Sequence, residues 1–459
     1  MNLFALLQKR AAAGKPVRVG LIGAGKFGTM FLAQARRLNG LHLYGVADLA
    51  PERAKASLGR AGWLPEQIGA GSFAEALKSG ATHVTDSAEA LIKADGMEVV
   101  IDATGSPAAG IRHALMACAH GRHIVMVNVE ADALAGPLLA QQAEQAGIVY
   151  SLAYGDQPAL IAEMVDWARA TGFDVIAAGK GTKYLPVYHA ATPQTVWQHY
   201  GFTDEQVANG DFNAQMFNSF LDGTKSGIEM AAVANACDLT PAPDGLAFPP
   251  CGVDDLPMVM RPAVAGGHLH HKGQVEVISS LERDGRPVFR DLRWGVYVAF
   301  EAPNDYVKRC FAEYGLRTDD SGRYSAMYKP YHLIGLELSI SVLSAALRGE
   351  PTGCPRGFRG DVVATAKRDL AAGEKLDGEG GYTVWGKLMP AADSLRLGGL
   401  PIGLAHNVTL RQPVKAGRPV RWSDVAYDAT DDAIAFRRRM EQAFMPPDPA
   451  GKEAARAAE

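Results

Sequence analysis

The first third of the chain alternates short, wholly apolar runs with stretches of helical spacing. Val17–Ile22 and Leu41–Ala47 have the pattern of buried strands, and Gly25–Leu38 between them has that of a helix. Two later apolar runs continue the series, Val99–Ala103 and His123–Val127. Buried strands that alternate with helices are typical of a parallel sheet. We therefore predict a doubly wound α/β domain over residues 1–155.

The pattern changes in the middle of the chain. Pro158–Ala170 is amphipathic, Val175–Ala178 is strand-like and ends in a Gly/Lys loop, and Asn213–Asn235 has helical spacing. This mixture predicts an α+β domain over residues 156–355.

Glycine and proline punctuate the last quarter, where the apolar runs are short. We predict a small β-rich domain over residues 356–430. Residues 431–459 should form a C-terminal tail, and within it Pro446–Glu459 should be frayed or helical only in part.

Composition and charge narrow the class of protein. The 459 residues are 47% hydrophobic and 21% charged, and the net charge of −4 provides no basic field for a nucleic acid. The five cysteines lack the spacing of a zinc site or a disulfide framework, which favours a reducing compartment. No apolar run approaches the length of a membrane span. We expect a cytoplasmic protein with no membrane partner.

A glycine-rich turn carries the strongest chemical signal. Gly23-Ala24-Gly25-Lys26-Phe27-Gly28 follows the first strand and opens the first helix of the sheet, as GxGxxG does in dinucleotide-binding proteins. Asp48 ends the second strand, where an acid binds the adenosine ribose and favours NAD over NADP. Arg53 could partly reverse that preference.

Two polar segments follow later strands of the same sheet, at the edge where open sheets bind ligands. They are Asp102-Ala103-Thr104-Gly105 and Asn128-Val129-Glu130. We expect Thr104, Gly105, Asn128 and Glu130 to flank a nicotinamide. The alternative for each segment is a polar helix cap or turn.

Several motifs together resemble the deoxyxylulose-phosphate-reductoisomerase-like (DRL) family, which is related to homoserine dehydrogenases. Besides the glycine-rich turn and the Asp102 segment, they are Val127–Asp132, Ala178–Gly181, Asp222–Lys225, Glu229–Asn235 and Pro330–Leu333. Residues 363–376, 400–404, 415–417 and 422–424 are similar to a SAF (antifreeze-like) β module.

The resemblance implies an NAD(P)-dependent oxidoreductase with a Rossmann domain, a central catalytic and oligomerisation domain, and a β-rich C-terminal domain. A homodimer or homotetramer is the expected assembly. One member type converts 1-deoxy-D-xylulose 5-phosphate with NADPH, but it lacks an acid at the position of Asp48. Homoserine dehydrogenases carry a Lys where this chain has Val129-Glu130, which argues against homoserine.

Two lysines that follow the strand Val175–Ala178 are candidates for acid/base chemistry. Hydride transfer at a carbinol needs a group that exchanges a proton with the oxygen, and a lysine with a lowered pKa can do so. Lys180 and Lys183 are close in sequence, so we expect repulsion between them to lower the pKa of one of the two. The pair could instead bind a substrate anion or be solvated.

Asp222, Lys225 and Glu229 are spaced three and four residues apart, so on one helix they would share a face. The active-site interpretation is a lysine oriented by carboxylates. The structural alternative is a surface ladder of ion pairs.

Lys329 and His332 form a further candidate group, suited to orienting a polar substrate, and the alternative for His332 is a structural hydrogen-bonding role. His268 and His270 would share a strand face, but they lack a carboxylate or cysteine at metal-site spacing, and we interpret them as loop residues. We assign no metal ligands, and a divalent ion remains open because an isomerisation would require one.

The sequence thus predicts an oxidoreductase, NAD(H)-preferring, that acts on a small polyhydroxylated or phosphorylated carbonyl or alcohol. Lys180 or Lys225 would be the acid/base, and Lys183 and Lys329 would bind a substrate anion. One alternative is a true 1-deoxy-D-xylulose 5-phosphate reductoisomerase. The other is a non-catalytic protein that binds a nucleotide and a sugar acid.

Overall fold

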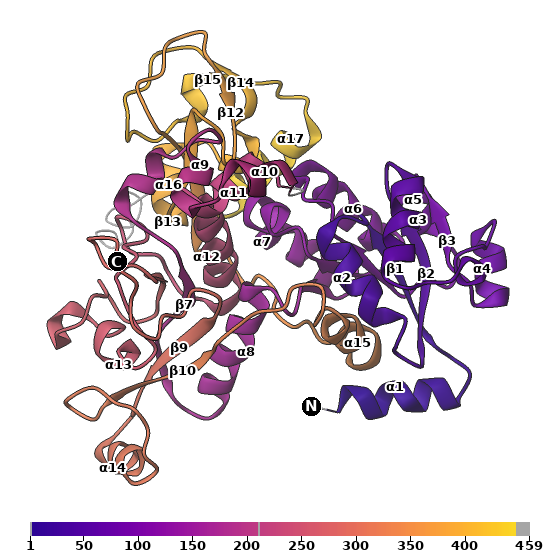
Figure 1. Ribbon diagram of the computed structural model, residues 1–459, viewed down its shortest axis with the longest axis horizontal. Coiled ribbons are helices and arrows are strands. Elements are labelled where there is room, and N and C mark those ends of the chain that lie inside the picture. The colour runs from indigo at the N-terminus through magenta and orange to yellow at the C-terminus, as the bar shows by residue number, and fades with distance from the viewer. Residues whose placement is uncertain (1, 210–211, 447–459) are drawn as a thin grey trace, which may run out of the picture.

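A parallel sheet forms the N-terminal part of the computed structural model, which describes residues 2–209 and 212–446 (Figure 1). Its order is β3-β2-β1-β4-β5-β6, the arrangement typical of Rossmann domains. The strands are β1 (Val17–Ile22), β2 (Leu41–Ala47), β3 (His83–Thr85), β4 (Val99–Asp102), β5 (His123–Met126) and β6 (Tyr150–Leu152). The predicted doubly wound fold is therefore confirmed.

Helices cover both faces of this sheet, because alternate strand residues point to opposite faces and both sets are apolar. One face packs against α1 (Leu3–Ala12), α2 (Lys26–Ala35), α3 (Pro51–Arg60) and α15 (Ser339–Arg348). The other packs against α4 (Phe73–Ser79), α5 (Ala88–Lys93), α6 (Pro107–Ala119) and α7 (Val129–Gln145). Helix α15 comes from the segment that we assign to the central domain, yet its apolar side lies in the N-terminal core.

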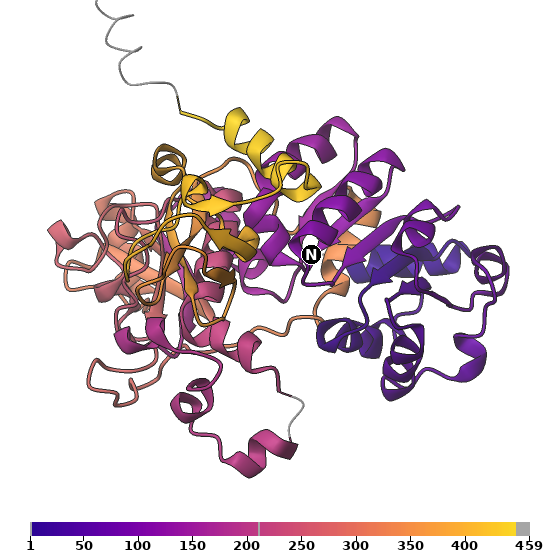
Figure 2. The same cartoon turned by 90° about the horizontal axis from the view of Figure 1, so that it is seen from above.

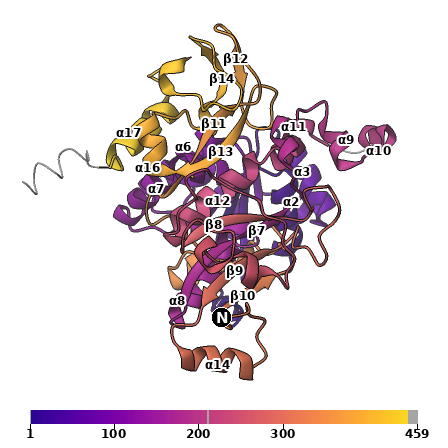
Figure 3. The ribbon, with the colours of Figure 1, turned by 90° about the vertical axis from the view of Figure 1, so that its left-hand side faces the viewer.

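The central part is an α+β arrangement around a second sheet of order β10-β9-β7-β8. Its strands are β7 (Asp174–Thr182), β8 (Gln274–Ser279), β9 (Val296–Glu301) and β10 (Tyr324–Lys329). The helices are α8 (Gln157–Ala170), α9 (Val196–Tyr200), α10 (Asp204–Asn209), α11 (Ala214–Leu221), α12 (Thr224–Cys237), α13 (Leu256–Val259) and α14 (Asp305–Glu313). Helices α9 and α10 project from the body of the molecule, as Figures 2 and 3 show.

Two predicted elements of the central part differ in the structure. Strand β7 continues through Thr182, so Lys180 lies within a strand and not in the loop after one. The predicted helix Asn213–Asn235 is two helices, because Gly223 adopts a φ of 92° and ends the helical path after Asp222.

The C-terminal part is β-rich, as predicted. It contains β11 (Gly360–Ala366), β12 (Lys375–Asp377), β13 (Val384–Pro390), α16 (Ala391–Leu397), β14 (His406–Leu410) and β15 (Val425–Ala426). Buried side chains of its strands belong to the same hydrophobic cluster as those of α8, α12 and the central sheet. The module therefore shares a hydrophobic core with the central part.

The segment predicted as a C-terminal tail begins with a packed helix, α17 (Asp432–Ala443). Its Arg437 is fully buried and donates to Asp361 at 2.6 Å, to Glu441 at 2.9 Å and to the Leu134 carbonyl at 3.0 Å. These bonds attach the helix to both α7 and β11, so residues 432–443 pack on the body of the protein. The part of the predicted tail from residue 447 onward lies outside the described residues.

Candidate functional site

The glycine-rich turn is shaped to admit a ligand on one side only. A Cβ atom at Gly23 would lie 2.7 Å from the Ala103 carbonyl oxygen, and one at Gly28 would lie 2.3 Å from that of Gly23. A Cβ at Gly25 would meet nothing within 4 Å. Gly25 is also the N-cap of α2 and supplies no capping side chain, so the first N–H groups of the helix are open to an anion. The turn therefore fits a dinucleotide pyrophosphate.

Asp48 is tied to this turn by its carboxylate. One oxygen accepts from the Ala24 N–H at 2.9 Å and the other from the Ala50 N–H at 2.9 Å, and Arg53 donates to both, at 2.9 and 3.2 Å. Burial would raise the pKa of Asp48, but these donors outweigh it and lower that pKa. A ribose hydroxyl can bind this carboxylate only by displacing the partly exposed Arg53.

Polar groups at the ends of β4 and β5 form one hydrogen-bonded network. The buried Asp102 accepts from the hydroxyl of Thr104 at 2.7 Å, and Asn128 donates to the same hydroxyl at 3.2 Å. Asn128 also caps α7 by accepting from the Ala131 N–H at 3.1 Å, so the capping alternative holds for this residue. Gly105 has open space where a Cβ would stand, which leaves this edge accessible.

An ion pair joins the central part to this edge. Lys225, in the first turn of α12, pairs with Glu130, in the first turn of α7. Burial alone would lower the pKa of Lys225, but the carboxylates of Glu130 and Glu379 outweigh it and raise the pKa. Lys225 therefore presents a permanent ammonium beside the carboxyl edge of the parallel sheet.

A second ion pair lies deeper. Lys180 of β7 and Glu229 of α12 are paired, and their side chains are only 6% and 3% exposed. Asp156, at the start of α8, interacts electrostatically with Glu229, Lys225 and Lys180. Burial and the nearby Glu229 raise the pKa of Asp156 to about 7, so its carboxyl can exchange a proton near neutral pH.

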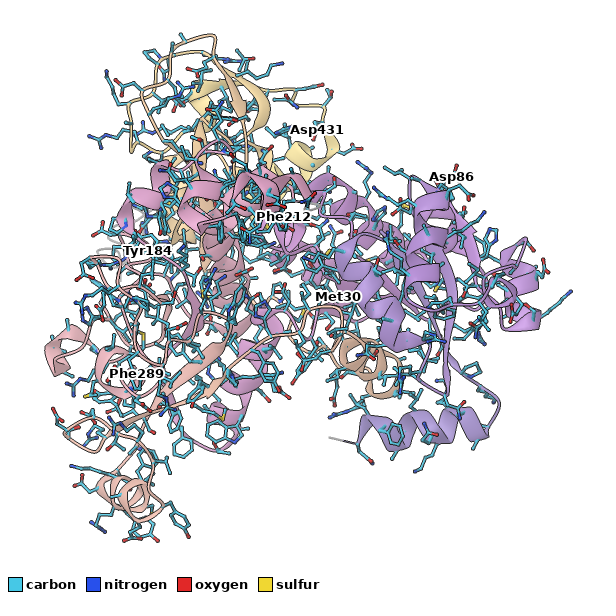
Figure 4. All side chains as sticks on the ribbon, viewed as in Figure 1. Met30, Asp86, Tyr184, Phe212, Phe289 and Asp431 are labelled. Carbon is cyan, nitrogen blue, oxygen red and sulfur yellow. The ribbon has the colours of Figure 1, made fainter. Side chains whose placement is uncertain are left out.

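The segment between β10 and α15 connects this cluster to the glycine-rich turn. Gly335 packs against α2, where a Cβ would lie 2.6 Å from the Phe27 carbonyl oxygen and 2.7 Å from the Cβ of Met30. Met30 is labelled in Figure 4, on the side of α2 that faces the central part. Lys329 and Glu337 brace the segment with a 2.7 Å ion pair.

His332 lies on the same connecting segment. Its Nδ1 is 2.8 Å from the Trp294 carbonyl oxygen. Burial lowers the pKa of His332, and Glu229 and Lys180 are among the charges that act on it. The imidazole therefore belongs to the cluster around the buried ion pair.

Two of the predicted groupings are wrong. Lys183 donates to the His199 carbonyl oxygen at 2.6 Å, and its pKa is lowered by burial and then by Arg293, not by Lys180. Asp222 caps the end of α11, is not on the same helix as Lys225, and pairs with Lys367 at 2.7 Å. The separation follows from the longer β7 and from the break between α11 and α12, which place these side chains in different directions.

Sequence reasoning missed two residues of the cluster, Asp156 and Glu379. Asp156 follows the last strand of the parallel sheet, as Asp102 and Asn128 follow earlier ones, so its position was a usable signal. Glu379 lies in the Gly378–Gly381 turn of the C-terminal module, and nothing in its local sequence points to the central lysines.

His268 and His270 lie in the loop before β8, and His270 contacts His271 with 3.2 Å between their Nδ1 atoms. Across residues 2–209 and 212–446, no group of three His, Cys, Asp or Glu side chains is arranged to hold a metal ion. In the same residues, no helix combines the length and the apolar character needed to cross a membrane.

Comparison with protein families gives two matches. Residues 155–338 match the catalytic domain of oxidoreductase DRL, and residues 361–426 match the SAF domain. The DRL match contains Asp156, Lys180, Lys225, Glu229 and His332. No curated protein matches the sequence.

The solved structures described next are distant likenesses. The 1-deoxy-D-xylulose 5-phosphate reductoisomerase of Zymomonas mobilis, in complex with NADPH, is 18% identical over 48% of this chain and 57% of its own, with a TM-score of 0.34. A probable dehydrogenase of Thermotoga maritima is 14% identical over 73% and 90%, with a TM-score of 0.38. The chain covers 43% and 48% of two further solved oxidoreductase chains. None of these likenesses bears on activity.

Proposed function

We propose that this chain, an oxidoreductase with a DRL catalytic domain and a SAF domain, uses a nicotinamide cofactor to oxidise or reduce a small polyhydroxylated alcohol or carbonyl compound. The observation that carries the proposal is the Lys225–Glu130 ion pair. It brings a lysine of the central part to the sheet edge that faces the glycine-rich turn.

The turn and the sheet edge would hold the cofactor. The residues concerned are Gly23, Ala24, Gly25, Lys26, Phe27, Gly28, Asp48, Thr104, Gly105 and Asn128. When bound, the nicotinamide supplies the hydride acceptor or donor. The open Cβ positions at Gly25 and Gly105 support this placement.

The central cluster would handle the proton. In the reductive direction the carbonyl carbon gains a hydride and its oxygen gains a proton, so the site needs an acid at the oxygen. We assign that role to the Lys180 ammonium, which Glu229 orients and which Asp156 would reprotonate. Lys225 would stabilise the developing oxyanion with its ammonium.

The charges around the two lysines favour a neutral substrate. Four carboxyl groups, those of Glu130, Asp156, Glu229 and Glu379, surround two ammonium groups. Carboxylates accept hydrogen bonds from hydroxyl groups and repel a phosphate. Lys329 and Lys183, expected to bind a substrate anion, already engage Glu337 and a backbone carbonyl. This supports a polyol over 1-deoxy-D-xylulose 5-phosphate.

The preference for NAD(H) rests on Asp48, whose carboxylate would repel a 2′-phosphate. Arg53 weakens this preference, because its positive guanidinium pairs with Asp48 and is exposed enough to meet a 2′-phosphate. Fluorescence titration with NADH and NADPH measures the balance. We expect tighter binding of NADH, and a hundredfold preference for NADPH would refute the Asp48 argument.

Turnover is tested with a panel of polyols, sugar acids and their phosphates, including 1-deoxy-D-xylulose 5-phosphate, with NAD(H) and NADP(H). We expect activity on an unphosphorylated polyol or its carbonyl form. Activity confined to the deoxyxylulose phosphate would identify a reductoisomerase. Cofactor binding without any turnover would support the non-catalytic alternative.

Lys180→Met tests the proton step. Turnover should fall at least a hundredfold because the proton-exchanging group is gone, while NADH affinity should stay within about twofold. Lys272→Met is the matched control. Lys272 pairs with Glu301 at the opposite end of the same sheet from Lys180, and its side chain is 53% exposed. Unchanged turnover in Lys180→Met would exclude Lys180 from the chemistry.

A further inference from the structure

The C-terminal module is docked onto the junction between α11 and α12, just before Lys225. Asn218 donates to the Gly380 carbonyl at 2.8 Å, and Gln215 donates to the Glu379 carbonyl at 2.8 Å. A Cβ at Gly380 would lie only 2.0 Å from the Gln215 carbonyl oxygen. The turn that carries Glu379 is thus held in direct contact with α11.

A second set of contacts fixes the same junction. Lys367, at the end of β11, is almost fully buried, pairs with Asp222 at 2.7 Å and donates to the Gly381 carbonyl at 2.7 Å. The Gly386 N–H of β13 donates to the Thr224 hydroxyl at 2.8 Å. Asp222 and Thr224 lie just before Lys225, so the module contacts the chain on both sides of the glycine at which α12 begins.

We propose that Glu379 of the C-terminal module is a positioning residue of the active site, whose charge acts through space on the Lys225 ammonium while Glu130 of α7 pairs with it directly. The module is then a required part of the site and not an appended binding domain. This proposal rests on the function proposed above.

The local charges agree with this arrangement. Burial and the nearby Glu130 raise the pKa of Glu379 to about 7, while Lys225 opposes the shift. Asp222, Asp156 and Glu229 are the other charged groups that act on Glu379 or Lys225 from the elements packed around them. Glu379 therefore gains or loses charge near neutral pH, and the field on Lys225 changes with it.

The reactivity of Lys225 tests the proposal without a known substrate. The full chain is treated with acetic anhydride at several pH values, and acetylation of the Lys225 peptide is followed by mass spectrometry. Glu379→Gln removes one carboxylate, so the pKa of Lys225 should fall and its acetylation at pH 8 should become about tenfold faster or more. Glu379→Asp keeps the charge and should restore most of the wild-type rate.

Glu374→Gln is the matched control. Glu374 lies in the same module but pairs with the exposed Arg368, so Lys225 should react as in the wild type. Thermal unfolding of each variant shows that the fold is kept. A folded Glu379→Gln variant with the wild-type acetylation rate overturns the proposal.

The outcomes separate the two proposals. If the wild type binds neither NADH nor NADPH, the proposed function fails whatever Lys225 does. If it binds one of them and the acetylation rate of Lys225 does not respond to Glu379→Gln, only the role of Glu379 fails. Once a substrate is found, Glu379→Gln should lower kcat about tenfold and shift its pH profile, with the KM for the cofactor unchanged.

Discussion

Asp132 of α7 is a fully buried carboxyl group away from the cluster. Tyr150 donates to one of its oxygens at 2.9 Å, and no group among the described residues donates to the other. Burial raises the pKa of Asp132 to about 7, and the bond from Tyr150 only partly opposes it. Asp132 lies in the first turn of α7, where acidic residues are common, so the sequence does not show that its carboxyl group is buried.

Asp132→Asn should stabilise the protein at alkaline pH. The folded state holds a proton that the unfolded state releases above its ordinary pKa of 3.8, so wild-type stability falls as pH rises from about 4 to about 7. The shift corresponds to at most about 4 kcal/mol. Urea unfolding at pH 4 and pH 8 should show the variant gaining on the wild type only at pH 8. Asp320→Asn, at an exposed position, is the control, and equal gains at both pH values would contradict the prediction.

The lysines show what residue-scale reasoning could achieve. It selected Lys180, Lys225 and His332, which the structure brings to one cluster, but it also selected Lys183 and Asp222, which the structure places elsewhere. The residue type identified groups capable of the chemistry. Their directions depended on where β7 and α11 end, which is a property of whole elements.

At the scale of elements, we expect substitution of two glycines in the turn before α2 to have different effects, one on stability and one on cofactor binding. Gly28→Ala would place a Cβ 2.3 Å from the Gly23 carbonyl oxygen, so the helix must move from the strand. We expect a loss of about 1–3 kcal/mol in the free energy of unfolding. Differential scanning calorimetry measures it.

Gly25→Ala is the companion variant, because its Cβ points into open space and its φ of −71° suits alanine. The unfolding temperature should stay close to that of the wild type, but NADH should bind about tenfold or more weakly because the methyl group stands where the pyrophosphate approaches. If Gly25→Ala binds NADH with wild-type affinity, the cofactor does not bind at this turn.

Whether an element could be predicted depended on how local its sequence pattern is. Strands β1 and β2 and the turn before α2 were predicted closely, because their patterns are local and both faces of the sheet are covered. The break at Gly223 was not, because α11 and α12 both have helical spacing and a single glycine between them is tolerated in a helix.

For the molecule as a whole, the Lys367–Asp222 pair connects the C-terminal module to the central part. Lys367→Met should cost about 3–5 kcal/mol, because Asp222 would remain buried without its counter-charge. The double variant Lys367→Met/Asp222→Asn should recover much of that loss. Chemical unfolding of the three variants and the wild type measures the coupling, and strictly additive losses would show that the pair does not connect the two parts.

The sequence by itself determined the parallel sheet, the glycine-rich turn and the residue types of the proposed site, because each depends on neighbours only a few positions away. The tertiary structure alone decided which charges meet. Lys180 and Glu229 are 49 positions apart, and Lys225 and Glu130 are 95 apart. Pairs so distant form only when the sheets pack, α12 begins at Gly223 and the C-terminal module docks. A buried charge without a partner costs free energy, so the charges brought together by this packing are paired.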